Sequence, residues 1–123
     1  MYSISELAIK VQTKPHTLRY YEKEGILTAH RKENGIRWYD EQHVKWLKFV
    51  MKLRETKMPI AQIKVYTQLL KEGEHTSLAR LQLLETHQRD IQNQITTLLE
   101  TDALLDRKIT AYKEYLHAIE SNA

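Results

Sequence analysis

A stretch near the N-terminus carries side chains that suit the binding of a polyanion. It holds His16, Arg19, Tyr20 and Lys23 in close succession. On a helix these positions share one broad face, opposite Leu18, so that cationic and hydrogen-bonding groups would project outward together. An Arg guanidinium can bind the edge of a guanine or clamp a phosphate, and a Tyr hydroxyl can donate to a phosphate. This stretch therefore predicts a nucleic-acid contact.

A second basic stretch follows, in a segment that favours a small β-hairpin. The β-prone runs 26–28 and 36–39 flank a polar stretch that contains Arg31 and Lys32. The Asn34-Gly35 pair within it is a strong turn signal. We therefore expect a hairpin wing that displays basic side chains.

Alternation along the second run of the hairpin predicts where its side chains point. Arg37 and Tyr39 would lie on one side of the strand and Trp38 on the other. We expect Trp38 to face the core, and Arg37 and Tyr39 to face the DNA backbone or minor groove. Tyr21 has two open interpretations, because two adjacent tyrosines cannot both face outward: it either packs in the core or contacts DNA.

Catalytic and metal chemistry are not expected. The chain has no Cys, which excludes disulfides, thiolate metal sites and cysteine nucleophiles. Its six His show no paired ligand spacing such as i, i+4, and its three Gly form no phosphate-binding loop. We therefore expect no catalytic residue, no metal site and no cofactor.

Helix start and stop signals place the outward-facing residues on the second helix of a pair. Ser3 and Glu6 form a capping-box pattern at the start of the first helix. Pro15, preceded by Thr13 or Lys14 as cap, starts the second helix, and Gly25 ends it. Two short helices joined by a tight turn make a helix-turn-helix, whose second helix can enter a DNA major groove.

Two further helices complete the expected N-terminal domain, residues 1–72. Asp40 caps the third helix, and Met58-Pro59 opens the fourth, which Gly73 closes. Residues 1–72 hold 14 Lys and Arg against 8 Asp and Glu, whereas the rest holds 5 against 8. The basic domain suits a polyanionic partner. The charged fraction of 28%, the absence of a long apolar run and the absence of a secretory signal predict a cytoplasmic protein without membrane spans.

After a linker at 73–76, residues 77–119 read as one long helix with a heptad pattern, followed by a tail at 120–123. Such a helix indicates a coiled coil with the same helix of a second copy of the chain, that is, a homodimer. The alternative is that the helix packs partly on its own N-terminal domain. The expected dimerisation residues are Leu81, Leu84, Ile91, Ile95, Leu98, Leu105, Ile109, Tyr112 and Leu116.

Several motifs together resemble the MerR family of bacterial transcription regulators. They are the Ile-Ser-Glu-Leu-Ala start at 4–8, the segments 17–27 and 34–39, and the Met58-Pro59-Ile60 turn. The chain is most similar to the short-tailed branch that includes aldehyde- and nitric-oxide-linked regulators, but it lacks their cysteine. The resemblance implies a mainly α fold: a winged helix-turn-helix DNA-binding domain with a β-hairpin wing, then a long dimerising coiled-coil helix. It also implies that the helix at 77–119 pairs antiparallel with its copy in the dimer.

The resemblance also implies a function and a set of contacts. Family members act as homodimers that bend and untwist promoter DNA so that RNA polymerase can engage it. A basic phosphate contact at Arg54 and a contact from the wing are further implications. The effector stays open, and so do two other functions: a coiled-coil interaction module that binds an acidic protein, and a DNA-architectural protein. The expected DNA-binding residues are Lys14, His16, Thr17, Arg19, Tyr20, Tyr21, Lys23, Arg37, Tyr39 and Arg54.

Overall fold

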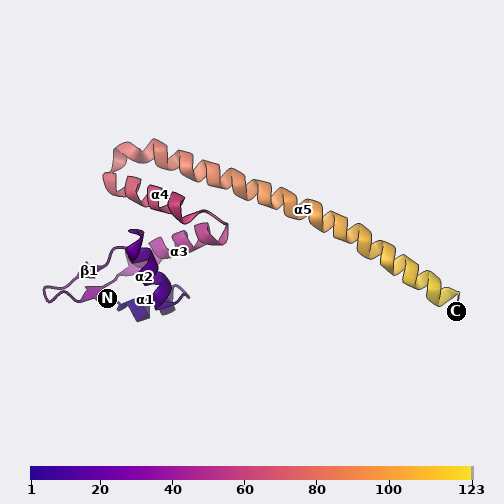
Figure 1. The fold of residues 1–123 in the computed structure, drawn as a ribbon, viewed down its shortest axis with the longest axis horizontal. Coiled ribbons are helices and arrows are strands. Elements are labelled where there is room, and N and C mark those ends of the chain that lie inside the picture. Colours follow the sequence, from indigo (N-terminus) through magenta and orange to yellow (C-terminus); the bar gives the residue numbers. More distant parts are fainter. Residues whose placement is uncertain (123) are drawn as a thin grey trace. The chain divides into compact units, whose positions relative to one another are not determined.

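The computed structural model describes residues 1–122, and across them the chain forms six helical segments and one antiparallel hairpin (Figure 1). The mainly helical fold with a small hairpin and a long C-terminal helix is confirmed. Ala123, at the end of the tail expected at 120–123, lies outside the described residues. In chain order the elements are α1 Ile4–Lys10, α2 Pro15–Lys23, β1 His30–Arg31, β2 Arg37–Trp38, α3 Glu41–Glu55, α4 Ile60–Glu72, the 3-10 helix η1 Glu74–Thr76, and α5 Ser77–Ser121.

The helix boundaries follow the local capping signals. Ser3 and Glu6 form the expected capping box at α1, where each side chain accepts a hydrogen bond from the other residue's backbone N–H. Lys14 is the N-cap of α2, and Pro15 occupies its first turn. Gly25 follows the C-cap of α2 with a φ of +78°, a left-handed conformation that favours glycine.

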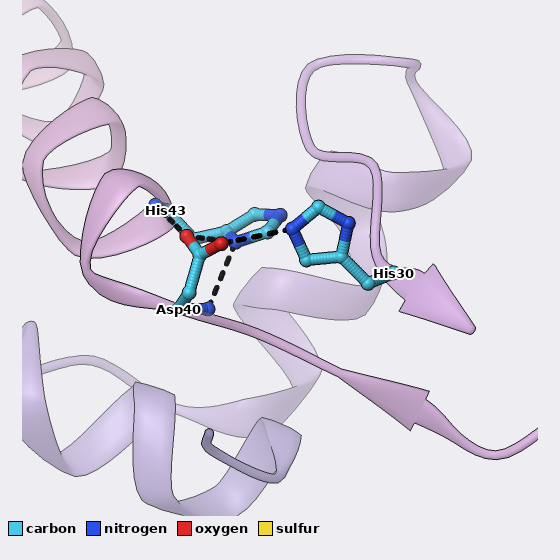
Figure 2. A group of neighbouring side chains, drawn as sticks. All are labelled: His30, Asp40 and His43. Carbon is cyan, nitrogen blue, oxygen red and sulfur yellow. Dashed lines mark hydrogen bonds and ion pairs between the residues drawn. The ribbon is translucent and has the colours of Figure 1, made fainter. Parts of the chain in front are cut away.

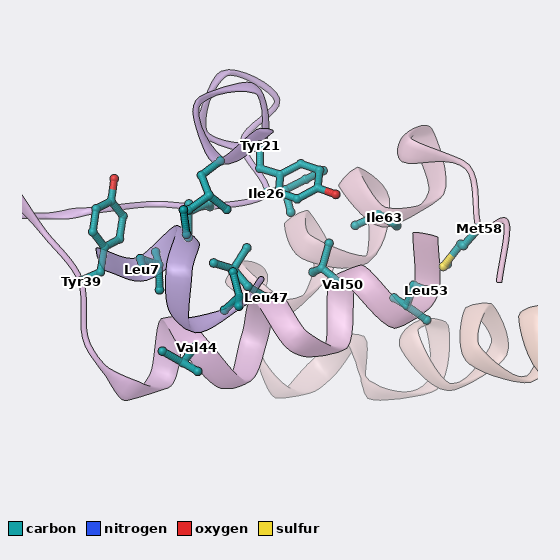
Figure 3. Close-up of a cluster of buried hydrophobic side chains, with 14 residues drawn as sticks. Leu7, Tyr21, Ile26, Tyr39, Val44, Leu47, Val50, Leu53, Met58 and Ile63 are labelled. Carbon is teal, nitrogen blue, oxygen red and sulfur yellow. The ribbon is translucent and has the colours of Figure 1, made fainter. Parts of the chain in front are cut away.

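The core of the N-terminal unit is built from the inward faces of α1 to α4 and the segments between them (Figure 3). On α3 the buried residues recur every three positions, from Val44 to Leu53, so burial on this helix follows its period. Burying one such Leu or Ile side chain stabilises a fold by about 1.5–3 kcal/mol. The buried hydrophobic residues are Leu7, Ala8, Val11, Leu18, Tyr21, Ile26, Leu27, Tyr39, Val44, Leu47, Val50, Leu53, Met58 and Ile63.

The hairpin is shorter and begins later than the sequence predicts. The expected first strand at 26–28 is wrong, since the strand that pairs is His30–Arg31, with His30 opposite Trp38 and Arg31 opposite Arg37. The backbone amides of Ile26 and Leu27 both donate to the carbonyl oxygen of Tyr21 at the end of α2. Their side chains are buried in the core, so this run closes the helix and does not extend into a ladder.

The chain divides into two compact units, Met1–Leu84 and the remainder of α5 from Glu85 onward. Helix α5 is continuous over 45 residues and extends past the predicted end at 119. At 1.5 Å per residue its length is about 70 Å. No helix within residues 1–122 is both long and apolar enough to cross a membrane.

The predicted apolar seam of α5 lies largely open to solvent. Leu98 and Tyr112 are 69% and 67% exposed, and Leu105, Ile109 and Leu116 are all more than half exposed. Ile95 is half exposed, whereas Ile91 is partly covered. A row of large apolar side chains at heptad spacing is costly to leave in water.

Candidate nucleic-acid interface

The outward face of α2 presents the basic and hydrogen-bonding side chains that the sequence singles out. Leu18 is fully buried and anchors the opposite face of the helix. This anchoring fixes which side of α2 faces outward, because residues three and four positions apart share a face. Exposed side chains at this face are Lys14, His16, Arg19, Tyr20 and Lys23, and Thr17 is half-buried.

The hairpin wing, residues 30–38, holds its tip by local hydrogen bonds. The side-chain oxygen of Asn34 accepts from the backbone N–H of Ile36 at 3.1 Å, and Gly35 takes a φ of +84°. The guanidinium of Arg31 donates to the carbonyl oxygen of Gly35 at 3.1 Å. These contacts set Arg31 directly across the ladder from Arg37.

A groove of about 430 Å³ lies between α2 and the wing, and we call it the α2–wing groove. Four cationic side chains line it, two from α2 and two from the wing, together with one carboxylate. Such a concentration of one sign of charge in a concave surface attracts an anion such as a DNA phosphate. The residues that line it are Arg19, Glu22, Lys23, Leu27, Thr28, Ala29, Arg31 and Arg37.

The expected orientation of the side chains at 37–39 is wrong at Tyr39, and also at Trp38, which does not belong to the core cluster. Tyr39 is fully buried, whereas Trp38 is only partly covered. The chain leaves the ladder after Trp38, and Tyr39 pairs its backbone with Tyr2 at 2.7 and 2.9 Å. Its hydroxyl donates to Glu22 of α2. Burial and the hydrogen bond to Glu22 raise the pKa of Tyr39 well above its usual range.

Of the ten expected DNA-binding residues, Arg19, Lys23 and Arg37 line the α2–wing groove, whereas Tyr21 and Arg54 make other contacts. Tyr21 is only 6% exposed, which favours the core alternative, and burial raises the pKa of its hydroxyl. Its neighbour Tyr20 stays outside, with the two ring centroids 6.0 Å apart. Arg54 donates to the carbonyl oxygen of Met58 at 2.8 Å, in the turn before α4, and does not line the groove.

A polar cluster that sequence spacing does not reveal lies beside the wing (Figure 2). The Asp40 carboxylate lies 2.9 Å from Nε2 of His30 on β1 and 3.1 Å from Nδ1 of His43 on α3. The His30 ring also packs against Trp38, with centroids 4.4 Å apart. The one local signal was the capping box that Asp40 and His43 form at the start of α3. The contact with His30 is non-local and depends on the hairpin.

The hydrogen bonds of this cluster assign it a structural role. The three residues bring their ligand atoms within 4.8 Å of one another, a spacing that a metal ion could use. However, Nδ1 of His43 accepts from the backbone N–H of Asp40 at 3.0 Å, and Nε2 donates to the carbonyl oxygen of Thr28 at 2.7 Å. Because both ring nitrogens of His43 are hydrogen-bonded, a metal ion could bind His43 only by displacing one of these two bonds. The cluster therefore ties the wing to the start of α3.

The Asp40 carboxylate should make stability depend on pH in acid. Its pKa is lowered from 3.8 to about 2, first by the hydrogen bond with His30 and then by the amides of His43 and Gln42. A lowered native pKa stabilises the fold above the ordinary pKa, and this stabilisation is lost as the pH falls through the native pKa. We expect the free energy of unfolding to fall less steeply between about pH 4 and pH 2 in Asp40→Asn than in the wild type.

This expectation is checked by urea unfolding followed by circular dichroism at fixed protein concentration. The side-chain carbonyl oxygen that Asp40→Asn introduces can still accept from the capping N–H groups, so the variant removes the charge and keeps the cap. Asp106→Asn on exposed α5 is the matched control. Parallel pH profiles for Asp40→Asn and the wild type would refute the assignment.

Comparisons with known proteins agree with this geometry. A family model described as "MerR HTH family regulatory protein" matches residues 2–70. The HTH-type transcriptional regulator AdhR of Bacillus subtilis (strain 168) is 37% identical over 83 residues, which cover 67% of this chain and only 59% of AdhR. An uncharacterized HTH-type transcriptional regulator of Haemophilus influenzae is 31% identical over 114 residues, covering 92% of this chain and 84% of that protein.

Solved structures extend the similarity over nearly the whole chain. A putative MerR family transcriptional regulator from Listeria monocytogenes superposes with a TM-score of 0.91 at 31% identity, covering 99% of this chain and 93% of the other. HiNmlR, described as a MerR family regulator lacking the sensor domain and bound to promoter DNA, superposes with a TM-score of 0.84 at 31% identity. That match covers 92% of this chain and 90% of HiNmlR.

Proposed function

Because this chain belongs to the MerR HTH family of regulatory proteins, we propose that it binds promoter DNA sequence-specifically as a homodimer. The observation that carries the proposal is the α2–wing groove, where Arg19 and Lys23 of the helix meet Arg31 and Arg37 of the wing. A DNA-binding domain of this type needs a cationic helix and a cationic wing on one surface. A protein that binds an acidic partner through α2 alone does not need the wing.

The exposed side chains have separable roles in this proposal. Arg19 enters the major groove and contacts a base edge, and Tyr20 donates its hydroxyl to a phosphate. Lys23 and Arg37 contact phosphates on either side of the α2–wing groove. Lys14, His16 and Thr17 lie at the start of α2, where they would contact the backbone next to the helix N-terminus.

Tyr21 and Tyr39 do not belong to the proposed contact set, because both are buried. They act indirectly: their buried rings anchor α2 and the end of the wing to the core. Arg54 is a further phosphate contact in this proposal, outside the α2–wing groove, and its guanidinium also donates to the carbonyl oxygen of Met58.

The second copy of the chain covers the apolar seam of α5. Pairing two such helices antiparallel would bury the a and d side chains and join two copies of the domain 1–72 through the linker at 73–76. The exposure of Leu98, Leu105 and Ile109 in the single chain supports this assignment. A two-fold dimer would present two copies of α2 to two major grooves.

Regulation would then follow from deformation of the DNA. Bending a promoter site costs on the order of 1–6 kcal/mol. A modest change in the geometry of the dimer can therefore change the bend of the DNA, and with it the relative position of the promoter elements that RNA polymerase binds. We place this activity in the cytoplasm, with RNA polymerase as the further partner. The effector is unassigned, and no cysteine is available to sense it.

The proposal is tested by selecting duplexes from a random-sequence pool with the purified protein and measuring binding across a salt series. The selected duplex and a shuffled version of it are compared. We expect specific binding to be roughly 10³-fold tighter or more, and to weaken steeply with salt as counterions are released from contacted phosphates. Selection without a consensus, with equal weak binding to both duplexes, would contradict the proposal.

A further inference from the structure

One carboxylate stands among the four cations of the α2–wing groove. Glu22 lies on α2, with a side chain that is only 14% exposed. One of its oxygens lies 3.1 Å from Nη1 of Arg37 on the wing. Its other oxygen accepts from the hydroxyl of Tyr39, which is fully buried. The carboxylate thus joins the helix to the second strand of the wing and to the residue that follows it.

The negative charge of Glu22 is unfavourable on a surface that binds DNA. A negative group close to a bound phosphate weakens binding, and a mostly covered carboxylate loses hydration. Both costs are offset only by the bonds to Arg37 and Tyr39, of which the first is charge-assisted. Position and bonding therefore point to a role in geometry, since the charge itself opposes DNA binding.

The wing has few other ties to α2. Its two strands pair with each other over two residues each, and Tyr39 is anchored to the N-terminal segment through Tyr2. His30 and Asp40 fix the wing to the start of α3, which is a different element. Within residues 1–122, the ion pair with Arg37 and the hydrogen bond from Tyr39 connect α2 to the end of the wing, and both involve Glu22.

We infer that Glu22 is a positioning residue that sets the separation between the recognition helix α2 and the wing. Through its bonds to Arg37 and Tyr39, Glu22 fixes the position of the Arg37 guanidinium relative to the bases that α2 contacts. Such fixed spacing distinguishes a correct site, where helix and wing contacts are made together, from a sequence where only one is made. This inference rests on the proposed function.

The test is Glu22→Gln, which removes the charge and keeps an oxygen that can accept from Tyr39. We expect the ratio of affinities for the selected and shuffled duplexes to fall by roughly tenfold, the size of effect expected from one lost charge-assisted hydrogen bond. Affinity for the shuffled duplex should stay equal or rise, because a negative charge has left the surface. We also expect faster amide hydrogen exchange at Arg37 and Trp38 in the free protein.

Glu24→Gln is the matched control. Glu24 lies on the cap of the same helix, pairs with Lys64 at 2.8 Å and does not line the groove. The Glu24→Gln variant also removes one negative charge from this helix, so we expect it to raise the affinity for both duplexes equally. The ratio of the two affinities, and amide hydrogen exchange at Arg37 and Trp38, should stay unchanged. A double variant tests whether Glu22 acts through Arg37. Once Arg37→Ala has removed the guanidinium, adding Glu22→Gln should not change the affinity ratio any further.

Two outcomes would overturn the inference. If Glu22→Gln behaves like Glu24→Gln, with both duplexes bound more tightly and an unchanged ratio, the carboxylate acts only through its charge. If the ratio falls equally in the Arg37→Ala background, Glu22 does not act through Arg37. Absence of any consensus for the wild type would overturn the proposed function itself, and thermal unfolding of each variant checks that it is folded.

Discussion

Replacing Leu98 and Leu105 of α5 by Glu is expected to convert the proposed dimer into monomers and to remove tight binding to the selected duplex. With a at Leu81 and d at Leu84, repeating every seven residues, both residues occupy d positions of the heptad, and they are 69% and 53% exposed in the single chain. Burial of one Leu stabilises an interface by about 1.5–3 kcal/mol, and a two-fold dimer contains four such side chains. Four added carboxylates would also repel one another in the seam.

Analytical ultracentrifugation checks the oligomeric state, and duplex titration checks the binding. The matched control is Thr97→Glu with Leu104→Glu, which adds the same charges at c positions of the same helix. Leu104 is 49% exposed but lies off the a/d seam, so this variant should remain dimeric. Dimers that survive in the Leu98/Leu105 variant, or monomers in the control, would show that the assigned heptad is wrong.

Arg19→Ala is expected to have the second-largest effect, on DNA binding alone. Arg19 is exposed on the outward face of α2 and lines the α2–wing groove. A bidentate contact between Arg and a guanine discriminates by about 1–3 kcal/mol. Affinity for the selected duplex should therefore fall by about tenfold to a hundredfold, while affinity for the shuffled duplex changes little.

Fluorescence anisotropy with both duplexes measures this difference. Arg107→Ala, at an f position of α5 and exposed, is the control for loss of one positive charge. An equal loss on both duplexes would mean that Arg19 contacts a phosphate and no base. Unchanged binding to both would remove Arg19 from the interface altogether.

Features that depend on neighbouring residues could be predicted from the sequence. The capping box at Ser3, the start of α2 at Pro15 and its end at Gly25 all lie where the local pattern places them. The exposed face of α2 follows from helical period once Leu18 is assigned to the core. These are short-range effects of hydrogen bonding and side-chain direction, which the chain encodes within a few residues.

Features that depend on contacts between distant residues cannot be predicted from local sequence patterns. The burial of Tyr39 follows from its backbone pairing with Tyr2 and from the hydroxyl contact with Glu22, neither of which strand alternation can indicate. The first strand begins later than the β-prone run at 26–28 predicts, because Ile26 is buried in the core. The contact of His30 with Asp40 joins residues ten positions apart and forms only once the hairpin has brought them together.

If a dimer places two copies of α2 on one DNA site, a hydroxyl-radical footprint on the selected duplex will show both of them. We expect two protected half-sites related by a dyad, with centres about one helical turn, or a whole number of turns, apart. Protection should vanish in the Leu98→Glu/Leu105→Glu variant at concentrations that saturate the wild type. A single half-site protected at saturation, or uniform protection without boundaries, would contradict the account.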